Sequence, residues 1–158
     1  ENIFVLSCNI CELEEYVEKA RGAGKLLFLH MDLIDGIGRD HYAVKYISDR
    51  IRHDGIITTK SGFVRNAREF GVYVIQRLFM LDSMSFDTGL KSLSSVSHGP
   101  DALEILPGIM PGIIKEFTNE TRFPVIAGGL IREKNDVIQS LKAGALGVST
   151  SSEELWYM

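Results

Sequence analysis

The chain has 158 residues, 45% of them hydrophobic and 24% charged, which excludes a disordered or fibrous protein and is typical of one globular domain. Its 17 basic and 21 acidic residues give a formal charge of −4, which excludes a protein held to nucleic acid by its overall charge but allows a local basic face. No apolar run in the sequence approaches the ~18 residues of a membrane span, and two cysteines suit a reducing compartment, so we expect a cytoplasmic protein with no membrane partner.

Seven short apolar runs predict β-strands. They recur about every 24 residues, which is the length of a strand, a helix and two short loops. The stretches between them carry apolar residues at helical spacing, as at Leu13, Val17 and Ala20. The predicted strands cover residues 3–6, 26–33, 55–58, 72–79, 102–106, 124–127 and 145–149.

Strands that are apolar on both faces and alternate with helices indicate an all-parallel sheet. Two α/β architectures fit this pattern: an open doubly wound sheet and a closed (β/α)₈ barrel of the TIM type. A barrel needs an eighth strand, so we expect one further βα unit upstream of Glu1. No linker or shift in composition interrupts the sequence, and residues 1–158 are predicted to form a single domain.

Polar residues gather at the C-terminal ends of these strands. His30 and Asp32 come late in the second predicted strand, Arg77 in the fourth and Glu104 in the fifth. Ligands bind at this edge of parallel α/β folds, and burial of a charged group is costly unless the group is paired. The one-sided placement favours a ligand site, with a self-contained ion network of Asp32, Arg77 and Glu104 as the alternative.

Two late segments have the composition of phosphate-binding loops. Gly128 and Gly129 directly follow a strand, and glycines let backbone N–H groups approach an anion closely. Ser149, Thr150 and Ser151 follow the last strand and are predicted to open a helix, whose N–H groups and dipole favour negative charge. We therefore predict that these five residues bind a phosphate group.

Three local motifs have simpler interpretations. Residues 151–154 also fit a helix capping box, which needs no ligand. Cys8 and Cys11 form a Cys-x-x-Cys pair, but no other feature of the sequence supports a redox or zinc site. Gly36 and Gly38 begin a dinucleotide-binding fingerprint that His41 interrupts, so no cofactor is predicted.

The histidines predict no metal site. His41, His53 and His98 fall in predicted helices or loops, where we expect them to be solvated. His30 lies near the predicted ligand site, where we expect it to donate or accept hydrogen bonds rather than bind a metal.

A modest basic cluster is a candidate for binding RNA. Arg50, Arg52 and His53 end one predicted helix, Lys60, Arg65 and Arg68 follow on the next, and neighbouring helices could merge these residues into one basic face. Of these residues, we take Lys60, Arg65 and Arg68 as the candidates for contact with RNA. A solvated helix surface is the alternative, because basic residues are common near helix C-termini in any protein.

Several longer stretches of characteristic sequence lie in order along nearly the whole chain. They are HMDLIDGIGRD (residues 30–40), DGIITTK (54–60), QRLFMLDS (76–83), EILPGIMP (104–111), PVIAGGLI (124–131), VSTS (148–151) and LW (155–156). In these stretches the sequence resembles the glycerol-3-phosphate-responsive antiterminator family, the regulators of glycerol uptake operons in bacteria. That family begins with a further strand and helix that this sequence lacks, in agreement with the expected upstream unit.

The resemblance implies a TIM-like barrel without catalytic activity or a cofactor. It implies a regulator that binds glycerol 3-phosphate as effector and then acts on leader mRNA to prevent transcription termination. With the phosphate on residues 128–129 and 149–151, the glycerol hydroxyls would meet Asp32, Glu104 and His30. Arg77 would balance the carboxylates or reach the phosphate. The sequence leaves open whether the protein is a homo-oligomer.

A different function class is a TIM-barrel enzyme that acts on a small phosphorylated substrate, because this fold supports many chemistries. His30, Asp32 and Glu104 would then be acid–base candidates, and Lys60 a Schiff-base candidate.

Overall fold

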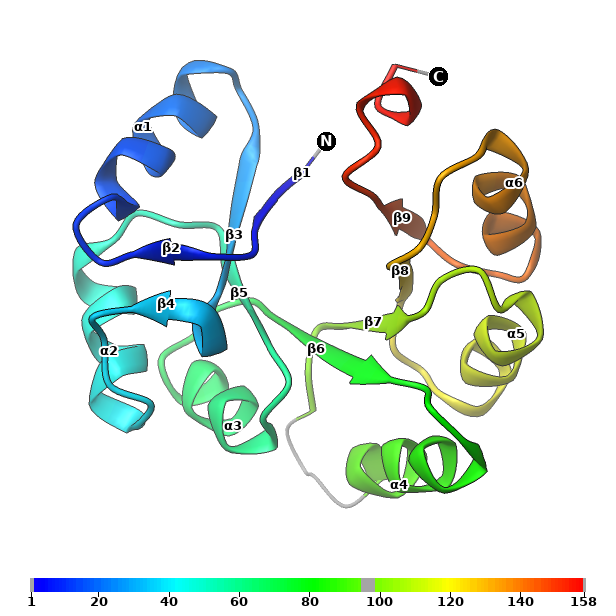
Figure 1. Ribbon diagram of the computed structural model, residues 1–158. Helices are drawn as coiled ribbons and strands as arrows, with labels where there is room; N and C mark the ends of the chain where they lie inside the picture. The colour runs from blue at the N-terminus through cyan, green and yellow to red at the C-terminus, as the bar shows by residue number, and fades with distance from the viewer. Residues whose placement is uncertain (1, 95–98, 158) are drawn as a thin grey trace. The chain divides into compact units, whose positions relative to one another are not determined.

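The computed structural model describes residues 2–94 and 99–157, so His98 and the prediction made for it lie outside the described residues. The chain divides into two compact units (Figure 1). Residues 2–76 with 99–100 form the first unit, and residues 77–94 with 101–157 form the second. The organisation of residues 1–158 as a single domain stays a prediction.

The strands of the described chain are β1 (Asn2–Val5), β2 (Cys8–Asn9), β3 (Leu26–His30), β4 (Ile34–Asp35), β5 (Gly55–Thr58), β6 (Val74–Phe79), β7 (Ala102–Leu106), β8 (Val125–Gly128) and β9 (Gly147–Ser149). The α-helices are α1 (Leu13–Gly22), α2 (His41–Arg50), α3 (Ser61–Glu69), α4 (Ser83–Ser94), α5 (Pro111–Glu120) and α6 (Lys134–Lys142). Two short 3₁₀ helices are η1 (Met31–Leu33) and η2 (Glu153–Leu155).

Each of the seven predicted runs overlaps a strand, and β5 and β7 match their predicted bounds. The second run differs, because β3 ends at His30 and the chain then turns into η1. Predicted residues 31–33 therefore do not continue the strand, and Leu33 is exposed rather than packed. The sequence pattern also gave no sign of β2 and β4, a short parallel pair of two residues each.

In the first unit the strands are parallel, with β3 paired to β1 and to β5, and β5 paired to the first half of β6. Helices α1, α2 and α3 lie on one side of these strands (Figure 1). The core lies between the two layers, where Leu27, Leu29 and Ile56 of the strands pack with Val17 of α1 and Val44 of α2. Apolar side chains spaced three or four residues apart give each helix its buried face.

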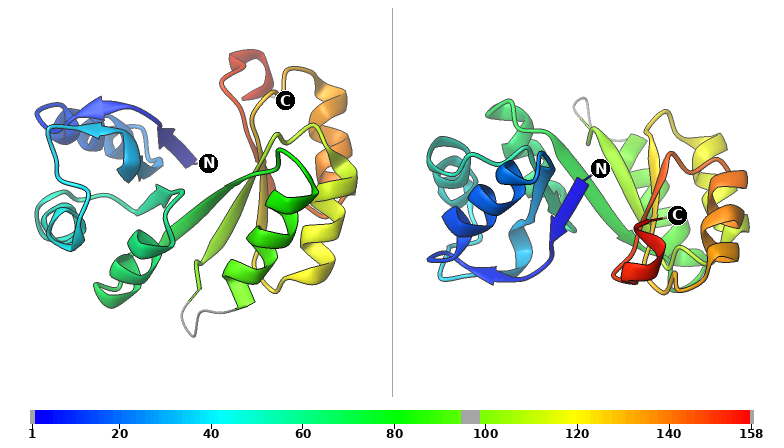
Figure 2. Two further views of the ribbon diagram at one scale, coloured as in Figure 1. Left: turned by 60° about the horizontal axis from the view of Figure 1, so that its bottom comes forward. Right: turned by 90° about the horizontal axis from the view of Figure 1, so that it is seen from above.

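In the second unit β8 pairs in parallel with β7 and with β9. Helices α4, α5 and α6 lie along one side of the strands (Figure 2). The core contains Leu103 and Ile105 of β7, Val125 of β8, and Ile114 and Phe117 of α5. Both units thus repeat one strand–helix pattern, which brings the C-terminal ends of their strands to one edge within each unit.

Within the described residues, no helix is long and apolar enough to cross a membrane.

Candidate functional site

Polar side chains at the C-terminal ends of the strands form one cluster in each unit. In the first unit the cluster centres on Asp32, which η1 carries directly after β3. In the second unit it centres on Glu104, the third residue of β7. We call them the Asp32 cluster and the Glu104 cluster. Both are buried, with Asp32 8% exposed and Glu104 1% exposed.

In the Asp32 cluster, neutral donors hold the carboxylate. The hydroxyl of Thr58 donates to Oδ1 of Asp32 at 2.9 Å. The backbone N–H and the hydroxyl of Thr59 donate to Oδ2 at 2.7 and 2.8 Å. Three hydrogen bonds therefore fasten the end of β3 to the end of β5, and they satisfy the charge of a buried carboxylate without a cation.

His30 is the last residue of β3 and is 3% exposed. Its Nδ1 lies 4.0 Å from Oδ2 of Asp32. That distance is too long for a direct hydrogen bond, so His30 lies beside the Asp32 carboxylate without being one of its three donors.

In the Glu104 cluster, a cation and a hydroxyl hold the carboxylate. Nε of Arg77, in β6, donates to Oε2 of Glu104 at 2.6 Å. The hydroxyl of Ser149, at the end of β9, donates to Oε1 at 2.5 Å. Arg77 is 7% exposed, so this is a buried ion pair whose partners depend on one another.

Gly128 closes this cluster because no larger residue fits there. A Cβ at this position would lie 2.5 Å from Oε1 of Glu104 and 2.7 Å from Oγ of Ser149. Glycine therefore lets the backbone of β8 pass directly beside the carboxylate.

The backbone turns sharply directly after Gly128. Gly129 has a φ of 76° and Leu130 a φ of 61°, and Leu130 is the one non-glycine residue with positive φ in the described chain. The N–H of Gly108 donates to the carbonyl oxygens of Gly128 and Gly129, which fixes the start of the turn. Turns of this kind can direct successive N–H groups toward an anion, and strained residues are frequent at functional sites.

The segment after β9 differs from its prediction. We predicted that Ser149, Thr150 and Ser151 open a helix, but the chain forms only the three-residue η2, which is too short for a substantial helix dipole. The predicted capping box at residues 151–154 is also wrong, because the N-cap of η2 is Ser152, whose side chain makes no capping hydrogen bond. The hydroxyl of Thr150 instead donates to the carbonyl of Ile131 at 2.8 Å.

The structure therefore divides the predicted site residues into groups. Asp32 lies in the first unit with His30 beside it, while Arg77, Glu104, Gly128 and Ser149 meet in the second. Gly129 and Ser151 lie on the chain next to that second group. Sequence reasoning did not identify Thr58 and Thr59 as partners of Asp32. The available signal was a pair of hydroxyl residues at the end of a strand, since Thr58 ends β5 and Thr59 follows it.

The candidate RNA-binding residues lie along α3. Lys60 is the N-cap of this helix, and its Nζ lies 5.4 Å from the centre of the Phe63 ring. Arg65 and Arg68 are exposed on the helix. At 1.5 Å of rise per residue, Lys60 and Arg68 are separated by about 12 Å, so Lys60 lies at the opposite end of the helix from Arg68.

The remaining motifs give no reactive or metal-binding group. Cys8 and Cys11 are free thiols, and burial, with Glu12 and Asp35 nearby, raises the pKa of Cys8, which disfavours a reactive thiolate. In the described part of the chain, no group of three or more His, Cys, Asp or Glu side chains is arranged to hold a metal ion.

The prediction that His41 and His53 are solvated is wrong for His53. The Nδ1–H of His53 donates to the carbonyl of Ile51 at 2.7 Å, and Nε2 is buried with no hydrogen-bond partner among the described residues. Burial lowers the pKa of His53, against smaller opposing effects of Ile51 and Asp54. His41 keeps 41% of its side-chain surface exposed.

Chemically, the two clusters offer hydrogen-bonding groups rather than a nucleophile. Both carboxylates already accept hydrogen bonds at both oxygens, which leaves neither as an unoccupied general base. Of the groups in and beside the two clusters, the turn at Gly129 and the guanidinium of Arg77 are the best suited to an anion.

Comparison with known proteins gives a consistent result. The family model of the glycerol-3-phosphate responsive antiterminator matches residues 1–156. The uncharacterized protein YgcP of Escherichia coli (strain K12) is 37% identical over 154 residues, which are 98% of this chain and 80% of YgcP.

Two solved structures are similar in both sequence and fold. The glycerol uptake operon antiterminator regulatory protein of Listeria monocytogenes has a TM-score of 0.92 and 36% identity, over 99% of this chain and 83% of that chain. A glycerol uptake operon antiterminator-related protein of Thermotoga maritima has a TM-score of 0.86 and 30% identity, over 98% of this chain and 87% of that chain.

More distant structures show the fold alone. Orotidine 5'-phosphate decarboxylase of Pyrococcus horikoshii has a TM-score of 0.66 at 14% identity, over 89% of this chain and 73% of that chain. The predicted fold class, an α/β fold of the TIM-barrel type, is confirmed. The further βα unit upstream of Glu1 stays a prediction.

Proposed function

Because this chain belongs to the glycerol-3-phosphate responsive antiterminator family, we propose that it binds glycerol 3-phosphate and then acts on the leader mRNA of a glycerol uptake operon to prevent transcription termination. The observation that carries the ligand part is the glycine turn at Gly129, which adjoins the buried pair of Arg77 and Glu104 in the second unit.

The phosphate group meets the turn after β8 and the segment after β9. Gly128 and Gly129 provide backbone close to the ligand, and Ser151 adds an exposed hydroxyl. The hydroxyls of Ser149 and Thr150 already donate to other groups, so these two residues act by holding the segment in position.

The glycerol end is recognised by hydrogen bonds. Glu104 accepts from ligand hydroxyls in addition to its present donors, because a carboxylate has about four lone-pair sites. Arg77 carries further N–H groups beyond Nε and directs them at the phosphate or at a hydroxyl. The assignment of His30 and Asp32 to the glycerol hydroxyls stays a prediction.

Catalysis forms no part of the proposal, and the effector is the small molecule itself. Regulation requires only that the ligand be bound more tightly by one state of the protein than by another. The alternative, an enzyme acting on a small phosphorylated substrate, would require turnover of glycerol 3-phosphate or a related compound by the same site.

Substitution of Gly129 tests the phosphate assignment. Gly129→Val should abolish detectable glycerol 3-phosphate binding in a calorimetric titration, because a branched side chain in the left-handed turn moves the backbone N–H groups. Gly71→Val is the matched control, since Gly71 also has positive φ (69°) but a Cβ there would meet nothing within 4 Å. Unchanged affinity in Gly129→Val, with the control also unchanged, would remove the phosphate assignment.

A further inference from the structure

A groove lined with arginines lies at the opposite end of the first unit from the Asp32 cluster. It consists of two adjoining pockets of about 220 and 260 Å³, which share Val17 and Arg21 of α1 and Arg52 after α2. Arg50, in the last turn of α2, lines the second pocket. We call the surface of Arg21, Arg50 and Arg52 the arginine groove.

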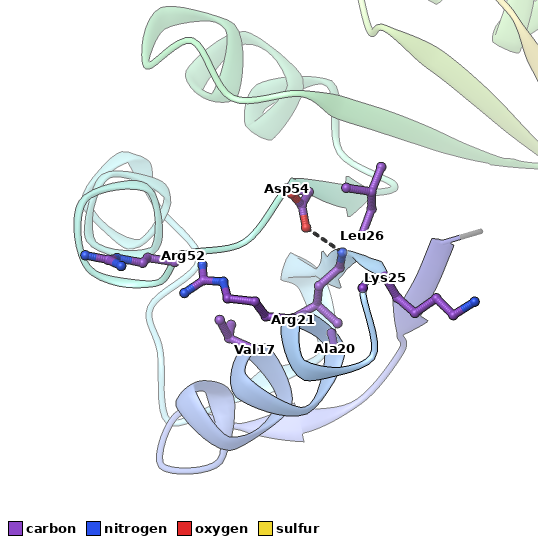
Figure 3. A pocket seen from close by; sticks show the side chains of 9 residues that line it. Val17, Ala20, Arg21, Lys25, Leu26, Arg52 and Asp54 are labelled. Carbon is purple, nitrogen blue, oxygen red and sulfur yellow. Dashed lines mark hydrogen bonds between the residues drawn. The ribbon is translucent and has the colours of Figure 1, made fainter.

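The groove lies at the N-terminal ends of the strands. Asp54 precedes β5, and its Oδ2 accepts from the N–H of Leu27 in β3 at 2.7 Å (Figure 3). In the same view the side chain of Arg21 extends from α1 toward Arg52, and that of Lys25 extends to the other side of the pocket. The four residues of β5 separate this end from the Asp32 cluster by about 13 Å.

The arginine groove carries mainly positive charge, with acidic residues at its border. The first pocket carries Arg21, Lys25 and Arg52 against Asp54, whose carboxylate is engaged by the backbone of β3. The second pocket adds Arg50, and Glu14 and Glu18 of α1 bound the positive region there. All of these lie in the first unit, where residues 2–76 hold 10 basic and 10 acidic residues, compared with 7 and 10 in residues 77–158.

Two exposed tyrosines lie on α2, the helix that carries Arg50. Tyr42 and Tyr46 are 76% and 45% exposed. They precede Arg50 by eight and four residues, so all three lie on one side of the helix. His41 and Lys45 of α2 contact the ring of Phe70, the C-cap residue of α3, and the ring of His41 also contacts that of Tyr42.

An extended row of arginines next to exposed aromatic rings matches one kind of ligand chemistry. Guanidinium groups bind the phosphates of a nucleic-acid backbone, and tyrosine rings stack on unpaired bases. A small phosphorylated ligand would use the arginines but leave the tyrosines without a role.

We propose that the arginine groove, with Tyr46 and Tyr42 beside it, binds single-stranded RNA, a proposal that rests on the proposed function because this RNA would be the leader transcript. Arg21, Arg50 and Arg52 hold successive phosphates, and the tyrosines stack on bases. Glu14 and Glu18 set the limit of the groove on α1.

The test measures binding of a fluorescent leader transcript at several salt concentrations. The double variant Arg21→Gln/Arg52→Gln should weaken binding by about tenfold or more and reduce the slope of log affinity against log salt by about 1.4, the release of counterions from two phosphate contacts. Lys115→Gln/Lys134→Gln, on exposed positions of α5 and α6, is the control with the same change in charge and should bind as the wild type does.

Two further variants test the other parts of the proposal: one tests stacking of bases on Tyr46, and the other tests repulsion of RNA by Glu18. Tyr46→Ala should weaken binding by about fivefold or more and leave the salt slope unchanged, because stacking releases no counterions. Glu18→Gln should strengthen binding, because it removes a negative charge from the rim.

The possible outcomes distinguish failure of the groove proposal from failure of the proposed function. If the wild type binds the transcript and Arg21→Gln/Arg52→Gln binds equally well, the groove proposal is overturned and the proposed function stands. The same holds if only Arg65→Gln/Arg68→Gln loses RNA, which would assign binding to α3. If the wild type binds no RNA with or without glycerol 3-phosphate, the proposed function fails and the groove proposal with it. Glycerol 3-phosphate affinity should stay unchanged in Arg21→Gln/Arg52→Gln.

Discussion

The two buried carboxylates of this protein are held in different ways. Asp32 in the first unit accepts from two hydroxyls and one backbone N–H, all neutral. Glu104 in the second unit accepts from the cationic side chain of Arg77 and from one hydroxyl. Asp32 lies in η1 directly after β3 and Glu104 lies within β7, so each is near the C-terminal end of a strand and the main difference is in their partners.

This difference in partners determines which of the two carboxylates can be substituted at the lower cost in stability. The hydroxyls of Thr58 and Thr59 can rotate toward another acceptor when Asp32 is altered, whereas the buried guanidinium of Arg77 keeps its charge and has no alternative counter-ion in the Glu104 cluster. The Glu104 cluster is therefore the more rigid of the two, which suits a surface that recognises a charged ligand. The following predictions test this contrast between the neutral partners of Asp32 and the cationic partner of Glu104.

The largest effect should follow removal of the Glu104 charge. Glu104→Gln leaves Arg77 buried without a counter-ion, and the free energy of unfolding in urea should fall by about 3–5 kcal/mol. Glu116→Gln, on the exposed surface of α5 in the same unit, is the control and should change stability little. Equal stability of the two variants would show that the ion pair does not hold the cluster.

A smaller effect is expected at the corresponding position of the first unit. Asp32→Asn keeps one acceptor oxygen but turns an amide N–H₂ either toward the hydroxyl of Thr58 or toward the N–H and hydroxyl of Thr59, so the free energy of unfolding should fall by about 1–3 kcal/mol. The exposed Asp35→Asn serves as reference under the same conditions. A loss as large as that of Glu104→Gln would contradict the contrast between neutral and cationic partners.

The smallest expected effect is on the pH dependence of the free energy of unfolding, to which His53 of the first unit contributes. Burial lowers the pKa of His53 below the value of 6.5 that it has when unfolded, so the unfolded state binds the proton more readily. The contribution of neutral His53 is complete above pH 6.5 and is lost as pH falls from there through the folded-state pKa. The slope is at most about 1.4 kcal/mol per pH unit for one proton.

His53→Asn should flatten the decline of unfolding free energy in that interval, since the titrating ring is gone. Thermal or urea unfolding of both proteins between neutral and mildly acidic pH provides the measurement. Parallel curves for the two proteins would mean that another group causes the acid sensitivity.

Sequence reasoning predicted the framework of the fold well because apolar runs and helical spacing are local signals. It placed Gly128, Glu104 and Arg77 together correctly, since parallel strands bring their C-terminal ends to one edge. It missed η1 after His30, because three residues are too few to distinguish the period of three in a 3₁₀ helix from the period of two in a strand. The helix expected after Ser149 was wrong, because the hydroxyl and carbonyl of Thr150 are engaged by Ile131 and Trp156 instead.

The arginine groove shows a different limit of sequence reasoning. Arg21 is separated along the chain from Arg50 and Arg52 by β3, η1, β4 and α2, and only their positions at or just after helix C-termini bring them together. Basic residues at helix ends are common in any protein, so the sequence alone gave no reason to prefer them to Arg65 and Arg68. The pockets and the tyrosines of α2 supply that reason.

The most direct test of the central claim is the affinity of the full-length protein for the leader transcript, with and without glycerol 3-phosphate, at one stated salt concentration. We predict that glycerol 3-phosphate raises the affinity for RNA and, by thermodynamic reciprocity, that RNA raises the affinity for glycerol 3-phosphate by the same factor. Tight binding of glycerol 3-phosphate with no RNA binding in either condition would contradict the account and direct attention to an enzyme acting on small phosphorylated compounds.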